Sequence, residues 1–139
     1  MIGIVIVSHG RLATEILKTA ELIVGKIENA MAVDIEPSAG MEKIHDDIEK
    51  AIKKVNSGDG VIIMTDMFGG TPSNISLSFL DRHKVEVITG VNVPMLVRVP
   101  QAREQKNLEE LAAFLKEYGQ RNITVASEIL KRKVGREIR

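Results

Sequence analysis

The chain of 139 residues contains no cysteine and no tryptophan, and its aromatic residues amount to one tyrosine and three phenylalanines. Without cysteine, the protein has neither disulfide bonds nor thiolate metal ligands. With so few aromatic rings, its core must consist mainly of Ile, Val, Leu, Ala and Met. The hydrophobic fraction of 44% is nevertheless close to the globular average, so these residues suffice for the core of a single domain.

The chain also has no excess of one charge, because its 19 Lys and Arg residues equal its 19 Asp and Glu residues in number. Proteins that bind nucleic acid usually carry a basic excess, so no nucleic-acid partner is expected. No apolar run approaches the ~20 residues of a membrane-spanning helix. The first residues form a strand-like run without the basic leader of a signal peptide. These features favour a cytoplasmic protein.

Short apolar runs alternate with helical patterns along the chain, which is typical of a parallel sheet with helices packed on it. We expect an α/β fold with an open, mostly parallel four-stranded sheet and helices on both faces. The predicted strands are residues 2–7, 30–35, 61–65 and 85–89. The predicted helices begin near Leu12, Met41, Thr71 and Leu108, while residues 90–94 are interpreted as a loop and 122–130 as either strand or helix.

Two polar residues stand where apolar strands end. His9 follows the run Ile2–Val7 through Ser8, and Asp66 follows the run Val61–Thr65. Open α/β sheets bind ligands at the carboxyl edge of their parallel strands. If the two runs are neighbouring strands, this edge brings an imidazole and a carboxylate together.

Such a pair suits a histidine that is phosphorylated reversibly. A neutral imidazole is nucleophilic near pH 7, and a carboxylate on one ring nitrogen fixes the tautomer and stabilises the charged ring. Taken alone, a histidine or an aspartate at a strand end is often only a turn residue. The hypothesis therefore depends on both occurring at one edge.

The segment after Asp66 supplies what a transferred phosphoryl group needs. Gly69 and Gly70 allow a tight turn and a close approach of the backbone. Thr71 offers a hydroxyl group, either as the N-cap of the next helix or as a donor to a phosphoryl oxygen. Pro72 has no N–H group, so the amides of Ser73 and Asn74 are the first expected donors at the start of that helix. No metal-ligand cluster is visible, and we expect transfer without metal or cofactor.

The remaining candidate ligands are interpreted as ordinary surface or core residues. His45 lies on the polar side of a charged helical pattern, and His83 lies in a polar turn. Five methionines are interpreted as packing residues rather than ligands: Met31, Met41, Met64, Met67 and Met95.

Three segments of the chain together resemble the signature loops of a known family. They run from Ile4 to Ala13, from Thr65 to Asn74 and from Thr89 to Leu96. In order and spacing they are similar to enzyme IIA of the mannose/fructose/sorbose class, a component of the bacterial phosphoenolpyruvate-dependent sugar phosphotransferase system (PTS). Any one of the three would be a weak signal, and all three in order are specific.

The resemblance implies a role for each site residue. His9 would accept a phosphoryl group from the carrier protein HPr and pass it to a histidine of a IIB component. Asp66 would pair with that histidine, and Thr71 would stand beside the phosphoryl group. The family also implies a homodimer in which residues 122–126 form an exchanged, antiparallel edge strand. The expected unit is a single IIA-type domain at 1–139, with IIB on a separate chain and contact with a membrane only through transporter components.

Other functions stay open at this point. A regulatory module would also be phosphorylated on His9, but a partner would read its phosphorylation state instead of using it for sugar uptake. A metal chelatase of the sirohydrochlorin/cobalt type also begins with a strand and a His-Gly turn, yet it needs a second histidine in its site. His45 and His83 have the wrong contexts for that, and the glycine-rich segment would be unexplained.

Overall fold

The computed structural model describes residues 1–82 and 84–138, with the side chains of 133–138 left undescribed. His83, which was interpreted as a turn residue, lies outside the described residues. Strands and helices alternate along most of the chain. In order, the elements are β1 (Gly3–His9), α1 (Leu12–Val24), β2 (Ala30–Ile35), α2 (Met41–Val55), β3 (Val61–Thr65), α3 (Thr71–Leu77), β4 (Val85–Thr89), α4 (Val93–Ala102), α5 (Leu108–Arg121) and α6 (Ala126–Ile138).

The four strands form one parallel sheet in the order β2-β1-β3-β4. The two central strands are apolar on both sides and buried along their length, apart from His9 at the end of β1. In the pairing of β1 with β3, Val7 lies opposite Thr65. His9 and Asp66 therefore follow paired residues of neighbouring strands, which confirms the predicted α/β sheet and brings both residues to its carboxyl edge.

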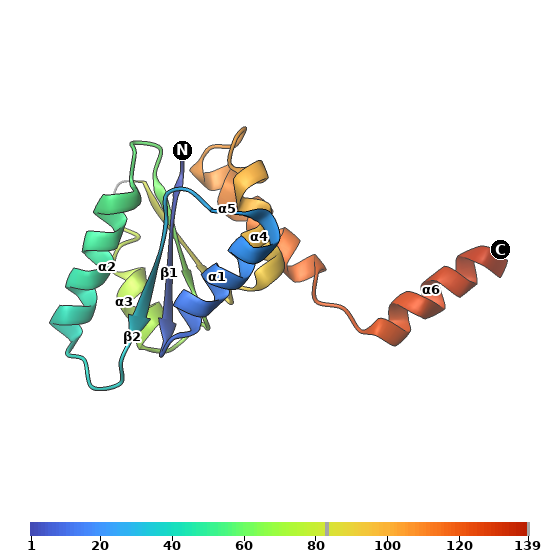
Figure 1. Ribbon diagram of the computed structural model, residues 1–139, viewed down its shortest axis with the longest axis horizontal. Helices are drawn as coiled ribbons and strands as arrows, with labels where there is room; N and C mark the ends of the chain where they lie inside the picture. The colour runs from blue at the N-terminus through green and yellow to red at the C-terminus, as the bar shows by residue number, and fades with distance from the viewer. Residues whose placement is uncertain (83, 139) are drawn as a thin grey trace.

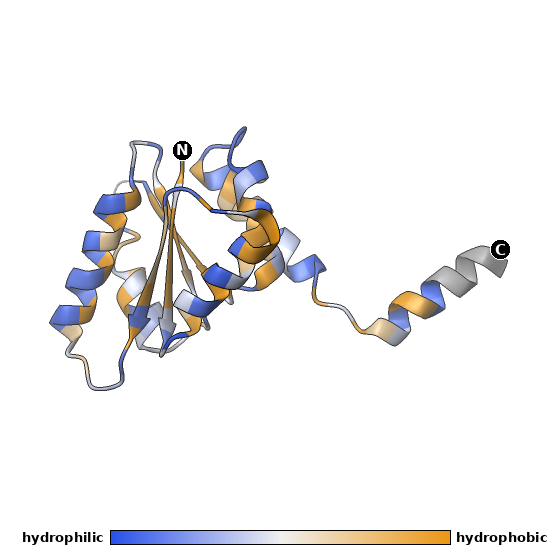
Figure 2. Cartoon of the chain, in the orientation of Figure 1, coloured by the Kyte–Doolittle hydropathy of each residue, from blue (hydrophilic) through white to orange (hydrophobic). Residues whose placement is uncertain are grey.

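Helices cover both faces of the sheet, as Figure 1 shows. One core cluster joins the sheet to α1, α4 and α5, and includes Ile4, Ile62 and Leu111. The other joins it to α2 and α3, and includes Ile48 and Phe79. In Figure 2 the orange side of α2 turns toward the sheet, as expected for an amphipathic helix whose stability comes from burying one face.

Two segments differ from the sequence-based expectation. The loop expected at residues 90–94 ends early, because α4 already begins at Val93, with the Asn92 side chain accepting a hydrogen bond from the Met95 amide (3.1 Å). The helix expected near Thr71 does begin at this residue, but its N-cap is Gly70, so the expected N-cap role of Thr71 is wrong.

The C-terminal part of the chain reaches away from the sheet. In Figure 1, α6 extends from the body beyond the end of α5. Residues 122–125 belong to no strand in this single chain, and Ala126 is already helical. An exchanged edge strand would need a second copy to pair with, so it stays a prediction.

In the described part of the chain, no helix combines the length and the apolar character needed to cross a membrane.

Candidate functional site

His9 and Asp66 are in direct contact at the carboxyl edge of the sheet. The His9 side chain is 53% exposed, whereas that of Asp66 is only 12% exposed. The oxygen Oδ2 of Asp66 accepts a hydrogen bond from the backbone N–H of His9 (3.0 Å) and lies 2.7 Å from the ring nitrogen Nδ1. Oδ1 accepts a hydrogen bond from the backbone N–H of Met67 (2.9 Å). The carboxyl group is thus held by three contacts.

This arrangement assigns the two ring nitrogens of His9. An ionised carboxylate accepts hydrogen bonds and donates none, so the nitrogen facing it must carry the proton. In the neutral ring, Nδ1 then donates to Asp66 and Nε2 holds the free electron pair. Because the ring is half exposed, Nε2 is the nucleophilic atom that this geometry presents.

The pKa of the Asp66 carboxyl lies below its ordinary value. Burial alone would raise this pKa, since it disfavours the charged form. The hydrogen bonds from the His9 backbone and ring, the charge of that ring and the hydrogen bond from Met67 together outweigh the burial. Asp66 is therefore a carboxylate near neutral pH, as the pairing with Nδ1 requires.

The glycine-rich loop lies beside the imidazole. Gly69 has a φ of +88°, which favours glycine, and Gly70 approaches the His9 ring closely. No side chain caps α3, so its first amides are not used by a capping group. The Asn74 N–H, however, donates to the Gly70 carbonyl (2.8 Å) inside the helix. This amide is therefore engaged inside the helix, and a contact of the exposed residue Asn74 with a phosphoryl group stays a prediction.

Ser73 is fully buried, and its hydroxyl has no hydrogen-bond partner among the described residues. The Ser73 hydroxyl is therefore shut off from solvent, and a contact of the Ser73 backbone N–H with a ligand stays a prediction. Thr71 is half-buried at the start of α3. Of the two residues, Thr71 is thus the one that solvent reaches at the start of α3.

At the start of α1, which follows His9 at the same edge, side chains accept hydrogen bonds from two of the backbone N–H groups. The buried Ser8 hydroxyl accepts a hydrogen bond from the Ala13 N–H (2.6 Å), and Asp34 of β2 accepts one from the Thr14 N–H (3.0 Å) and another from the Thr14 hydroxyl. Sequence reasoning missed both caps, although Ser8 and Asp34 stand at strand ends as His9 and Asp66 do. Two amides in the first turn of α1 are thus bound by side chains, whereas no side chain caps α3.

Two apolar side chains beside the site are exposed to solvent. Met67 is 55% exposed and Phe68 is 72% exposed. Met41, at the start of α2, is also exposed. The interpretation of Met41 and Met67 as packing residues is therefore wrong, whereas Met64 and Met95 are buried as expected. Met67 follows the last residue of β3 by only two positions, where the chain has already left the sheet.

His45 does not join the site. Its ring stacks on Phe79 (centroids 4.6 Å apart), and its Nδ1 lies 3.7 Å from an oxygen of Glu49 on the same helix. No group of three or more His, Cys, Asp or Glu residues in the described part of the chain is arranged to hold a metal ion.

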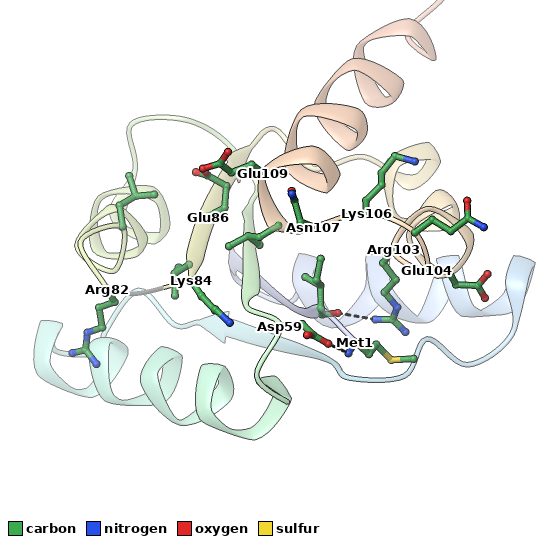
Figure 3. Close-up of a pocket in the computed structure, with 15 residues that line it drawn as sticks. Met1, Asp59, Arg82, Lys84, Glu86, Arg103, Glu104, Lys106, Asn107 and Glu109 are labelled. Carbon is green, nitrogen blue, oxygen red and sulfur yellow. Dashed lines mark hydrogen bonds and ion pairs between the residues drawn. The ribbon is translucent and has the colours of Figure 1, made fainter.

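A broad groove of about 1250 Å³ lies at the opposite, amino edge of the sheet (Figure 3). It is lined by charged side chains of both signs, among them Asp59, Lys84 and Arg103. Arg103 is buried and donates to the Ile2 carbonyl (3.2 Å), which ties the end of α4 to the start of β1. None of the predicted site residues lines this groove.

Comparison with known proteins identifies the family of this chain. Residues 3–116 match the family described as "PTS system fructose IIA component". The chain belongs to this family. It is 36% identical over 124 residues to the mannose-specific EIIAB component of the PTS from Escherichia coli K12, covering 88% of this chain but only 38% of that protein. With the fructose-specific EIIA component of Bacillus subtilis it is 30% identical over 133 residues, 95% of this chain and 91% of the relative.

A solved structure supports the same assignment. The IIA protein associated with the fucose utilization operon of Streptococcus pneumoniae superimposes with a TM-score of 0.79 at 30% identity, covering 92% of this chain and 95% of that one. The family model ends at residue 116, so the segment from 117 onward, with the predicted exchanged strand, lies beyond it. His9, Asp66 and the glycine-rich loop lie within the matched residues 3–116.

Proposed function

We propose that this IIA component carries a phosphoryl group on Nε2 of His9, taking it from phosphorylated HPr and passing it to a histidine of a IIB protein. The observation that supports this most is the pair of contacts between Asp66 and His9, at the backbone N–H and at Nδ1. They leave Nε2 as the exposed nucleophile of a ring whose other nitrogen is already bound.

The transfer is an in-line displacement at phosphorus. The electron pair of Nε2 forms the new N–P bond while the bond to the donor imidazole breaks, and the donor nitrogen keeps that electron pair. The His9 ring gains positive charge as the bond forms, and the Asp66 carboxylate stabilises this charge through the proton on Nδ1. Onward transfer to IIB is the same step with His9 as the donor.

The oxygen atoms of the phosphoryl group also need donors. The Gly69–Gly70 backbone lies beside the ring, and the amides of Thr71 and Ser73 follow it. The Thr71 hydroxyl is the side-chain donor in this proposal. Phosphoryl transfer depends mainly on positioning and on stabilising charge, so this set requires no metal ion.

The same proposal extends to the wider assembly. The chain would form a homodimer and work with a IIB component, and contact with a membrane would be indirect, through transporter components. The 38% of the E. coli EIIAB component that this chain covers corresponds to one part of that longer protein. The name of that relative is consistent with a IIA unit that works together with a IIB unit.

The test is phosphorylation by phosphoenolpyruvate, enzyme I and HPr, followed by mapping of the modified residue. We expect one label per chain, on His9, which is labile in acid and stable in base as an imidazole adduct is. His9→Ala should abolish the label, and the matched control His45→Ala should keep it, because His45 lies against Phe79 and outside the site. Labelling that persists in His9→Ala would disprove the assignment.

The second half of the reaction needs its own measurement. Labelled protein mixed with an unlabelled IIB protein should lose its phosphoryl group to IIB. A label that stays on His9 in the presence of IIB proteins of the mannose, fructose and sorbose classes would instead favour a regulatory module.

A further inference from the structure

Gly70 lies so close to the His9 ring that any side chain at this position would force the ring to move. A Cβ atom placed on Gly70 would lie 2.7 Å from Cε1 and 3.0 Å from Nε2 of His9. Its next contact, Cδ of Pro72 at 3.7 Å, is an ordinary van der Waals distance. The only close contact of such a side chain is thus with the edge of the ring that carries the nucleophilic atom.

The backbone conformation of Gly70 does not itself require glycine. Its φ of −121° and ψ of 178° are extended values that any residue adopts. Gly69 is the opposite case, since its φ of +88° favours glycine while a Cβ there would meet nothing within 4 Å. The two adjacent glycines therefore differ in what a side chain would disturb. At Gly69 it would strain the backbone of the turn, and at Gly70 it would collide with the imidazole ring of His9.

We propose that Gly70 is a positioning residue for His9, which acts by leaving room for the Cε1–Nε2 edge of the ring. Asp66 holds the ring at Nδ1, and Gly70 fixes where the far edge can lie. A methyl group at position 70 would push the ring away and break its 2.7 Å contact with Asp66. The role in phosphoryl transfer rests on the proposed function, whereas the contact with the ring does not.

The first test is a double-mutant cycle in which the melting temperature Tm is measured, and it needs no phosphorylation. Gly70→Ala is measured in the wild-type chain and in the His9→Ala background, where the ring is absent. We expect Gly70→Ala to lower Tm by a few degrees in the wild type, and by about 1 °C or less in His9→Ala. Gly40→Ala is the matched control, because Gly40 also has an extended conformation and a Cβ there would meet nothing within 4 Å.

The second test follows the ring directly by NMR. In the wild type, the ring nitrogens of His9 should show the Nδ1–H tautomer and a proton shared with Asp66. Gly70→Ala should lose both signatures, and Gly40→Ala should keep them.

If Gly70→Ala does not fold, the double variant His9→Ala/Gly70→Ala tests the proposal instead. Recovery of folding in the double variant supports the proposal, and its failure to fold overturns it.

The third test compares transfer rates. We expect Gly70→Ala to slow phosphorylation by HPr by about 10-fold or more, and to add little in an Asp66→Ala background, where the contact with Nδ1 is already lost. Equal Tm losses in both backgrounds, with unchanged ring signals, would overturn the role of Gly70. If Tm and ring signals behave as expected but His9 is never phosphorylated, the positioning stands and the proposed function fails.

Discussion

A single oxygen atom of Asp66, Oδ2, binds His9 twice, at the backbone N–H (3.0 Å) and at the ring nitrogen Nδ1 (2.7 Å). The first contact fixes the carboxylate relative to the end of β1, and the second fixes the ring relative to the carboxylate. Both contacts depend on the pairing of β1 and β3, which brings Asp66 next to the end of β1. The fold thus aims Nε2 without a further side chain.

Asp66→Asn tests the chemical role of this carboxylate. The amide is nearly the same size, but it removes the charge that stabilises the ring when phosphorus binds to Nε2, and it also permits the wrong tautomer. We expect the fold to persist and the rate of phosphorylation by HPr to fall by about 100-fold or more. Rapid-quench measurement of the label on His9 gives the rate, and Asp81→Asn at an exposed position is the control. A rate equal to that of the wild type would remove Asp66 from the mechanism.

The low pKa of the Asp66 carboxyl also predicts a dependence of stability on pH. An unfolded aspartate has a pKa of about 3.9, and the folded value lies below it. The contribution of Asp66 to stability is therefore fully present above the unfolded pKa and is lost as the pH falls through the folded pKa. In urea unfolding between pH 6 and pH 2, the wild type should lose more stability than Asp66→Asn. Parallel curves for the two proteins would show that the folded pKa is not lowered.

The sheet and most helices could be predicted because their residues follow a simple period. The buried strands β1 and β3 are continuous apolar runs, and α2 has apolar residues at helical spacing, with Ile44, Ile48 and Ile52 on its buried side. α4 was missed because Pro94 and Pro100 indicate a break. In the structure Pro94 stands in the first turn, where its missing N–H costs nothing, and Pro100 lies near the end of the helix.

The site was predictable only in part. His9 and Asp66 meet because strand ends align at one edge of a parallel sheet, which is a property of the topology. The contact of Gly70 with the ring, the use of the Asn74 amide inside α3 and the burial of the Ser73 side chain depend on how α3 packs. Such packing brings together residues that are not related by any regular spacing along the sequence, so the sequence alone does not indicate these contacts.

Ser8→Ala tests the hydrogen bond by which the Ser8 hydroxyl caps the start of α1 beside the site. The Ser8 hydroxyl satisfies the N–H of Ala13, and both residues are fully buried. Without the hydroxyl, this N–H stays unsatisfied in the interior, so we expect a loss of about 1–2 kcal/mol in the free energy of unfolding. Chemical denaturation measures this loss, and Ser38→Ala at an exposed loop position is the control. An unchanged free energy would mean that another group takes over the cap.

Val125→Asp tests the predicted exchange of the C-terminal segment between two copies. Ile123 and Val125 are 75% and 57% exposed in the single chain, and their spacing of two places them on one face of a strand. If residues 122–126 form an edge strand in a partner, this apolar face becomes buried, and a charge there is costly. The wild type should sediment as a dimer and Val125→Asp as a monomer with an unchanged circular dichroism spectrum of its body. Lys50→Asp, which adds the same residue to the exposed side of α2, should remain a dimer. A monomeric wild type would contradict the exchange itself, and a dimeric Val125→Asp would place the interface elsewhere.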